Sequence, residues 1–189
     1  TVVTSDRYRT AHAALAADSD SWVAQPGIEF AWATEPQDDP TPLWSLAHAW
    51  SAACLDALLL LVERRRVDLV EFGDYGGAAA VTLQSRRSGE ARLADVPVVV
   101  RAHTTWEMAE ALDRRPAAGL AARVVIALER QAFALADALV VPGPSTARAF
   151  ELAYGEEALP PRHVARPGFV LPPAAPESAR PAASGPLRL

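Results

Sequence analysis

The chain has 189 residues, enough for one α/β domain with a sizeable core, and half of them are hydrophobic. Its net charge of −5 provides no basic surface for nucleic acid. No uninterrupted apolar run of about 20 residues indicates a transmembrane segment, and no signal-peptide pattern opens the chain. With a single cysteine, Cys54, an internal disulfide is excluded. We therefore expect a soluble, cytoplasmic protein, for which peripheral contact with a membrane stays open.

Short runs rich in Val and Ile alternate along the chain with longer stretches of helical periodicity. Strands are expected at residues 1–5, 27–33, 67–72, 96–102, 138–143 and 163–168, and helices at residues 42–66, 121–137 and 144–155. In the first helix, the residues expected to face the core are Leu43, Leu46, Trp50, Leu58 and Leu61. Alternation of this kind is typical of βαβ units. We predict an α/β fold with one parallel sheet flanked by helices.

The stretch at residues 172–186 differs in composition from the rest. It consists of Pro, Ala and Ser with almost no large apolar residue, which is typical of a linker. We expect the globular domain to cover residues 1–171. Residues 187–189 read as the start of another strand, and the chain opens directly inside an expected strand. Both features predict a fragment of a longer protein.

Polar residues gather where three of the expected strands end. The end of the strand expected at 67–72 supplies Glu71, Gly73, Asp74, Tyr75, Gly76 and Gly77. The end of the strand at 96–102 supplies Arg101, His103, Thr104 and Thr105, and the end of the strand at 138–143 supplies Gly143 and Ser145. The carboxyl ends of parallel strands share one edge of a sheet, and ligands bind in the crevice beyond that edge. The sequence therefore predicts a ligand site there.

Each of these residues also has a purely structural interpretation. Asp74 can cap the following helix, and Arg101 can pair with a neighbouring carboxylate. Ser145 is expected to be the N-cap of the helix at 144–155. A lone histidine such as His103 at a domain edge is more often structural than catalytic. The hypothesis of a site thus depends on the coincidence of positions.

Several common sites are not indicated. No GxGxxG follows a strand, and neither a P-loop nor a GxSxG elbow is present. The four histidines are too scattered for a local metal motif, and Cys54 stands alone. We therefore expect no metal ion and no bound cofactor.

Three stretches, in this order, carry a family resemblance. They are VDLVEFGDYGG at 67–77, VPVVVRAHTT at 96–105, and an ER pair at 129–130 followed by ADALVVPGPSTARAF. Together they resemble the N-terminal domain of family-4 glycosyltransferases, which are retaining enzymes of the GT-B fold. The resemblance covers residues 67–171 well and the earlier part more loosely.

The resemblance implies a Rossmann-like sheet forming the acceptor-side half of an enzyme that moves a sugar from a nucleotide-sugar donor, its co-substrate, to an acceptor. His103 matches a histidine that faces the donor sugar. Asp74, Tyr75 and Gly76 match a loop near the acceptor. Glu129 and Arg130 match a structural pair that ties a helix to the strand that follows, and Glu71 is expected to be structural near the site. We expect Arg101, Thr104, Thr105 and Ser145 to line the substrate site.

The resemblance also implies a first strand with a glycine-rich loop ahead of Thr1 and a donor-binding domain after Leu189, and the sequence contains neither. The full-length protein is thus expected to be a transferase and the 189-residue chain alone to be inactive, because the leaving diphosphate would lack an electrostatic partner. Two alternatives stay open: a non-catalytic α/β ligand-binding or regulatory module, and a GT-B sugar-nucleotide epimerase, which would place carboxylates around the cleft. The acceptor and the donor are not identified.

Overall fold

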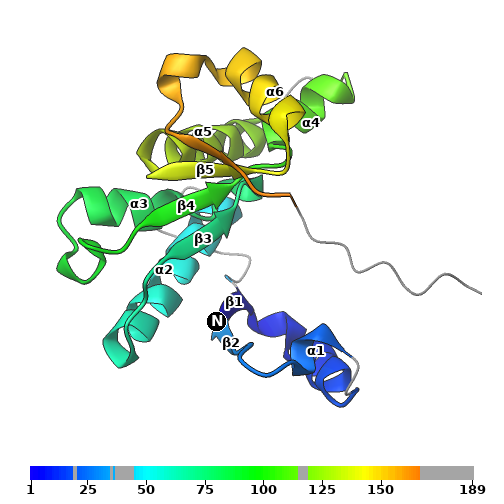
Figure 1. Ribbon diagram of the computed structural model, residues 1–189, viewed down its shortest axis with the longest axis vertical. Coiled ribbons are helices and arrows are strands. Elements are labelled where there is room, and N and C mark those ends of the chain that lie inside the picture. The colour runs from blue at the N-terminus through cyan, green and yellow to red at the C-terminus, as the bar shows by residue number, and fades with distance from the viewer. Residues whose placement is uncertain (19–20, 35, 37–44, 115–118, 167–189) are drawn as a thin grey trace, which may run out of the picture.

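The computed structural model describes residues 1–18, 21–34, 36, 45–114 and 119–166 (Figure 1). Its six strands are β1 Val2–Ser5, β2 Phe30–Ala33, β3 Val70–Gly73, β4 Val98–Arg101, β5 Ala138–Val141 and β6 Arg162–Val164. Every pairing between them is parallel. The predicted α/β class with parallel strands is confirmed. The expected linker at 172–186 and residues 187–189 lie outside the described residues.

The strands form two sheets instead of the single sheet expected. β1 pairs with β2, while the larger sheet has the order β3-β4-β5-β6. Among the described residues, no ladder joins β1 to β3. The expectation of one six-stranded sheet was therefore wrong. A run of apolar residues locates a strand, but it does not say which strand lies at each of its edges.

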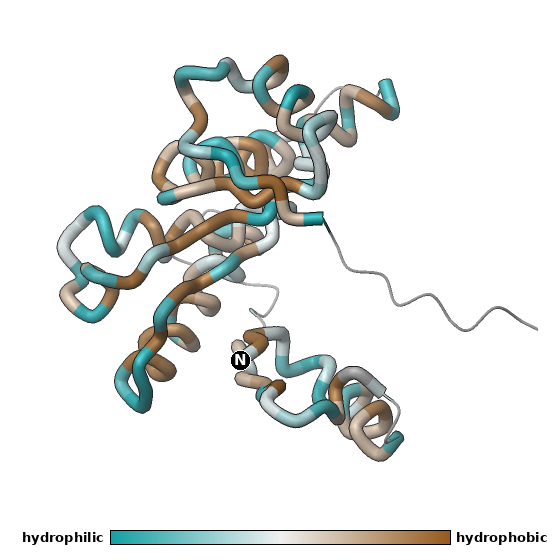
Figure 2. Tube along the Cα trace, viewed as in Figure 1, coloured by the Kyte–Doolittle hydropathy of each residue, from teal (hydrophilic) through white to brown (hydrophobic). Residues whose placement is uncertain are grey.

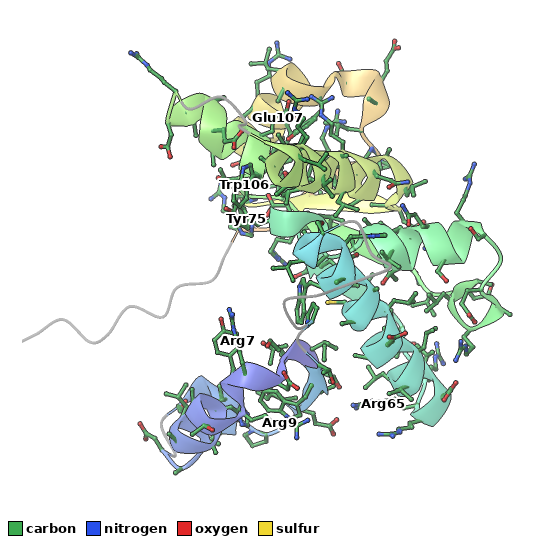
Figure 3. All side chains as sticks on the ribbon, turned by 180° about the vertical axis from the view of Figure 1, so that it is seen from behind. Arg7, Arg9, Arg65, Tyr75, Trp106 and Glu107 are labelled. Carbon is green, nitrogen blue, oxygen red and sulfur yellow. The ribbon has the colours of Figure 1, made fainter. Side chains whose placement is uncertain are left out.

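Helices connect the strands and cover one face of the larger sheet. They are α1 Arg9–Ala16, α2 Leu46–Arg64, α3 Ala80–Arg87, α4 Trp106–Leu112, α5 Leu120–Leu135 and α6 Pro144–Tyr154, with short 3₁₀ turns η1 Asp6–Tyr8, η2 Trp22–Ala24, η3 Tyr75–Gly77, η4 Ala91–Leu93 and η5 Glu156–Ala158. α2, α3 and α5 contact one another. They lie behind the sheet in Figure 1 and in front of it in Figure 3. α3 and α5 each lie between neighbouring parallel strands of the larger sheet, and because such connections are right-handed as a rule, the two helices lie on the same side.

The main core lies between the larger sheet and these helices. Val98 and Val100 of β4 are completely buried, and the apolar colour of β4 and β5 is continuous in Figure 2. The ring of Phe133 on α5 meets that of Phe150 on α6 edge to face, with centroids 5.4 Å apart. This packing holds β3, β4 and β5 side by side, so their carboxyl ends form a fixed edge.

α2 packs against the smaller sheet and against the helices that cover the larger one. Ser45 is its N-cap and accepts a hydrogen bond from the N–H of His48. Cys54 and Leu58 are buried, whereas Leu46, expected to face the core, is 50% exposed at the first turn. The helix contacts β1, β2, α3 and α5. Just beyond its end, Arg65 forms an ion pair of 2.6 Å with Glu29, which precedes β2.

By length and composition alone, α2 is long and apolar enough to cross a membrane. A core helix can pass the same test, and α2 packs in the fold as just described. The sequence-based expectation considered uninterrupted aliphatic runs only, and α2 reaches its 19 residues by alternating such runs with small and polar residues.

Candidate functional site

The candidate site lies at the carboxyl edge of the larger sheet. β4 pairs with β3 on one side and with β5 on the other, and Arg101 is level with Gly73 and Val140. Since all three strands are parallel, the loops that follow them leave from one edge. The prediction that these three strand ends meet at one edge is confirmed.

Asp74 joins the loops that follow β3 and β4. It is 5% exposed, and its Oδ2 accepts hydrogen bonds from the N–H groups of His103 at 2.6 Å and Thr104 at 2.9 Å. The N–H of Asp74 in turn donates to the carbonyl of Arg101 at 3.1 Å. Asp74 occupies the N-cap position of η3, as its structural interpretation predicted, but its side chain makes no capping hydrogen bond there. The carboxylate instead fixes the backbone that carries His103.

Glu129 on α5 holds the next part of the same loops. Its side chain is buried, and it accepts hydrogen bonds from the N–H of Gly76 at 2.9 Å and from the N–H of Trp106 at 3.0 Å. Burial raises the pKa of the Glu129 carboxyl to about 7, although these N–H groups and that of Glu107 act in the opposite direction. One carboxyl group therefore fastens η3 and the start of α4 to α5.

The close packing of η3 on α5 requires glycine at position 77. Gly77 has a φ of +68°, a conformation that side chains disfavour. A Cβ built there would lie 2.4 Å from the Cβ of Leu128 and 2.9 Å from its carbonyl carbon. The double glycine of GDYGG therefore serves the turn and the close approach to α5.

Thr105 is the N-cap of α4. Its Oγ1 accepts a hydrogen bond from the N–H of Met108 at 3.1 Å and lies 2.6 Å from the hydroxyl oxygen of Tyr154 on α6. The residue is completely buried. Thr105 was expected to line the substrate site, but both of these contacts are structural. Thr104, in contrast, is exposed.

The exposed part of the edge consists of His103, Thr104 and an aromatic pair. Tyr75 is 57% exposed, and its ring lies 5.3 Å from that of the half-buried Trp106, tilted by 32°. The two side chains lie together in Figure 3. The indole N–H of Trp106 donates to Glu110 at 2.6 Å. The edge thus presents the imidazole of His103 and the hydroxyl of Thr104 beside the apolar faces of the two aromatic rings.

Two arginines near the site are already paired. The guanidinium of Arg101 donates two hydrogen bonds of 2.7 Å to Glu71, so its interpretation as a partner of a carboxylate describes its contacts. Arg130 donates in the same manner to Glu107 at 2.9 and 2.7 Å. Arg130 was expected to tie α5 to the following strand, β5. Its hydrogen bonds instead lead to α4, and those of Glu129 lead to η3 and α4.

Ser145 is not the N-cap of α6. Pro144 has a fixed φ and takes the first helical position, so the cap is Gly143, whose carbonyl accepts from the N–H of Ala147. Ser145 lies exposed in the first turn, at the end of β5. It shares the edge with His103 but lies one strand further along.

The family model for Glycosyltransferase Family 4 matches residues 8–168, which is most of the chain. The chain belongs to Glycosyltransferase Family 4. Neither the curated proteins nor the solved structures give a match. The α/β architecture with parallel sheets and flanking helices is the one expected of a Rossmann-like half of a GT-B enzyme.

In this family-4 chain, the sequence analysis did not predict three residues that lie at the edge: Trp106, Glu110 and Tyr154. Trp106 directly follows the polar strand end, and Glu110 is four residues later, which is one turn of a helix. That spacing could have placed both on one helix face. Tyr154 is 49 residues from Thr105, and only the packing of α6 brings the two hydroxyl groups together.

The family-4 chain shows no cluster of three or more His, Cys, Asp or Glu side chains suited to a metal ion within its described residues. Burial raises the pKa of the Cys54 thiol to about 12, so the thiol is protonated at neutral pH. Cys54 is buried and takes the place of a small apolar residue in the core.

Proposed function

We propose that the chain is the acceptor-side domain of a retaining glycosyltransferase that moves a sugar from a nucleotide-sugar donor to an acceptor. Membership of a glycosyltransferase family supports the transfer of a sugar. The observation that carries the proposal is the hydrogen bonding of Asp74 to the backbone of His103 and Thr104. A buried carboxylate fixes a loop whose two side chains are exposed, which is the arrangement expected of a binding residue held in position.

In this proposal, His103 acts by orientation and hydrogen bonding. Transfer breaks the bond between the anomeric carbon and the diphosphate while the oxygen of an acceptor hydroxyl bonds to that carbon and its proton passes to the leaving diphosphate. Positive charge develops on the sugar ring as this happens. An imidazole at the strand end can hydrogen-bond to sugar hydroxyls and place charge near the reacting carbon. Thr104 adds a second hydroxyl beside it. The reaction as proposed uses no metal ion and no organic cofactor.

Tyr75 and Trp106 would form the acceptor side of the edge. Sugar rings and apolar groups both pack on aromatic faces, and these two rings lie on the loops that Glu129 fastens. A donor-binding domain elsewhere in the full-length protein would supply the groups that stabilise the leaving diphosphate. Residues 1–189 alone are therefore expected to show no transfer. We place the reaction in the cytoplasm, where nucleotide sugars are available.

The test compares His103→Ala with His163→Ala in the full-length protein. His163 is an exposed histidine on β6 and is a matched control for the loss of an imidazole. We expect His103→Ala to lower kcat/KM for transfer by about 100-fold or more and His163→Ala to leave it unchanged, because one positioned hydrogen-bonding group is typically worth that factor. Circular dichroism confirms that both variants fold. Equal activity of the two variants would return His103 to a structural role.

Product analysis separates the proposal from its alternatives. Wild-type full-length protein incubated with a set of nucleotide sugars and acceptors should yield a glycoside with the anomeric configuration of the donor, which NMR detects. An isomerised nucleotide sugar would instead indicate an epimerase. Tight binding without turnover of any donor would indicate a binding module.

A further inference from the structure

Two aromatic rings lie together on the acceptor side of the candidate site. Tyr75 follows β3 and Trp106 begins α4, and their ring centroids are 5.3 Å apart. Tyr75 is 57% exposed, and the two side chains lie side by side in Figure 3. Rings held in place at the ligand edge of a sheet offer electron-rich faces to a ligand. We call these two residues, together with Glu110, the aromatic subsite.

A carboxylate is part of this subsite. Glu110 lies one helical turn after Trp106, and its Oε1 accepts the indole N–H at 2.6 Å. Burial raises the pKa of the Tyr75 hydroxyl above its ordinary value, and the charges of Glu129 and Glu110 raise it further. The negative charge of Glu110 therefore acts on both rings. Because a carboxylate that accepts the indole N–H polarises the indole toward its ring, it strengthens the attraction of the ring face for a cation.

The charged groups around the subsite also favour a cation. Beneath the loops, Asp74 and Glu129 bind backbone N–H groups. Within the described part of the chain, no arginine forms an ion pair with Asp74, Glu129 or Glu110. The arginines beside the site, Arg101 and Arg130, each donate two hydrogen bonds to another carboxylate. Negative charge is thus in excess around the rings, which attracts cationic ligands and repels anionic ones.

We propose that the aromatic subsite binds a protonated amino group of the acceptor, so that the acceptor is a polyhydroxylated amine such as an amino sugar or an amino cyclitol. This inference rests on the proposed function and specifies the class of acceptor. The ammonium group packs on the faces of Tyr75 and Trp106 and donates a hydrogen bond to Oε2 of Glu110. A protonated amine has no lone pair and cannot attack the anomeric carbon. The nucleophile therefore stays a hydroxyl group of the same acceptor, and its proton passes to the leaving diphosphate as before.

The first test measures binding of three matched probes to the full-length protein by NMR titration. The probes are methyl glucosaminide, methyl glucoside and methyl N-acetylglucosaminide, which share a pyranose ring, and only the first carries a positive charge. We expect the glucosaminide to bind about tenfold more tightly than either uncharged probe, because it adds a cation–π contact and a charged hydrogen bond. This preference should shrink as salt is raised. Equal dissociation constants for the three probes would overturn the proposal.

The second test locates the amino group with single variants. Glu110→Gln keeps an oxygen that can accept the indole N–H but removes the charge, and Tyr75→Leu removes a ring. Each should reduce the tenfold preference for the glucosaminide to about twofold or less, whereas Tyr75→Phe, which retains the ring, should keep most of it. Glu157→Gln, the same change at an exposed glutamate of η5, is the control and should keep all of it. A preference that survives both Glu110→Gln and Tyr75→Leu would place the amine elsewhere and contradict the proposal.

A transfer assay with a set of nucleotide sugars separates this inference from the proposed function. If the wild-type protein glycosylates the glucoside as efficiently as the glucosaminide, the amine subsite is wrong and the transferase stands. If the protein binds the glucosaminide selectively but no nucleotide sugar yields a glycoside, the proposed transfer is wrong and the amine subsite stands.

Discussion

Acidic side chains are used in two ways around the strand ends of this protein. Beneath the loops that follow β3 and β4, Asp74 and Glu129 are buried and bind backbone N–H groups. On the strands themselves, Glu71 is partly exposed and binds the guanidinium of Arg101. The buried carboxylates fix main-chain positions, whereas the surface pair joins two side chains that solvent also reaches. We expect the two buried carboxylates to determine the geometry of the site. The surface ion pair between Glu71 and Arg101 is expected to contribute little to the stability of the fold.

Glu129→Ala should have the largest effect on stability. It leaves the N–H groups of Gly76 and Trp106 without their acceptor and opens a cavity beneath η3. We expect the free energy of unfolding to fall by about 3–5 kcal/mol. Urea denaturation measures it, with Glu157→Ala, an exposed glutamate on η5, as the control expected to change it by less than about 0.5 kcal/mol. Equal midpoints for the two variants would remove the distinction between buried and exposed carboxylates.

Because the pKa of Glu129 is raised, its contribution to the free energy of unfolding should depend on pH. A folded-state pKa of about 7, above the value of 4.5 for an unperturbed glutamate, means that the folded protein binds this proton more tightly than the unfolded chain does. The associated stability is present at low pH and is lost as pH rises through about 7. Relative to Glu129→Gln, the wild type should therefore lose about 2.5 kcal/mol between pH 5 and 8. Parallel stability curves for the two proteins would contradict a raised pKa.

Asp74→Asn should have an intermediate effect that is local to the loop after β4. An amide oxygen can still accept a hydrogen bond, but it loses the charge that strengthens both bonds to His103 and Thr104. We expect a loss of about 1–3 kcal/mol and faster hydrogen exchange at these two N–H groups. Exchange at Gly76 and Trp106, which bond to Glu129, should not change. Asp113→Asn, at the exposed end of α4, is the matched control, and a uniform increase in exchange would show that Asp74 supports the whole fold.

Much of the fold could be predicted from the sequence, because strands and helices leave local signals. The apolar run ending at Arg101 marked β4, and the Pro-Ser start and Tyr-Gly end marked α6. The separation of the two sheets left no such signal, since an apolar run does not indicate which strand pairs with each of its edges. Ser145 was wrongly predicted to be the N-cap of α6. The fixed φ of Pro144 suits the first helical position, which makes Gly143 the cap.

The candidate site was predictable in position but not in the roles of its members. His103 and Asp74 were both expected at the edge, yet only the structure shows that one holds the backbone of the other. Glu129 lies 53 residues from its partner Gly76 in the sequence. No local sequence pattern indicates that a carboxylate accepts hydrogen bonds from such distant N–H groups. Long-range partners of buried polar groups are the part of a site that sequence spacing leaves undetermined.

Glu71→Gln should have the smallest effect and thereby define the other side of the comparison. Although the contact with Arg101 has two hydrogen bonds, the side chains are 38% and 33% exposed, and solvent replaces the lost partner. We expect a loss of at most about 1 kcal/mol, which shrinks as salt is raised because exposed charges are screened. Urea denaturation at low and high salt measures it. A loss as large as that of Asp74→Asn, insensitive to salt, would mean that the surface pair also fixes the strand ends, since only a contact shielded from solvent would behave in that way.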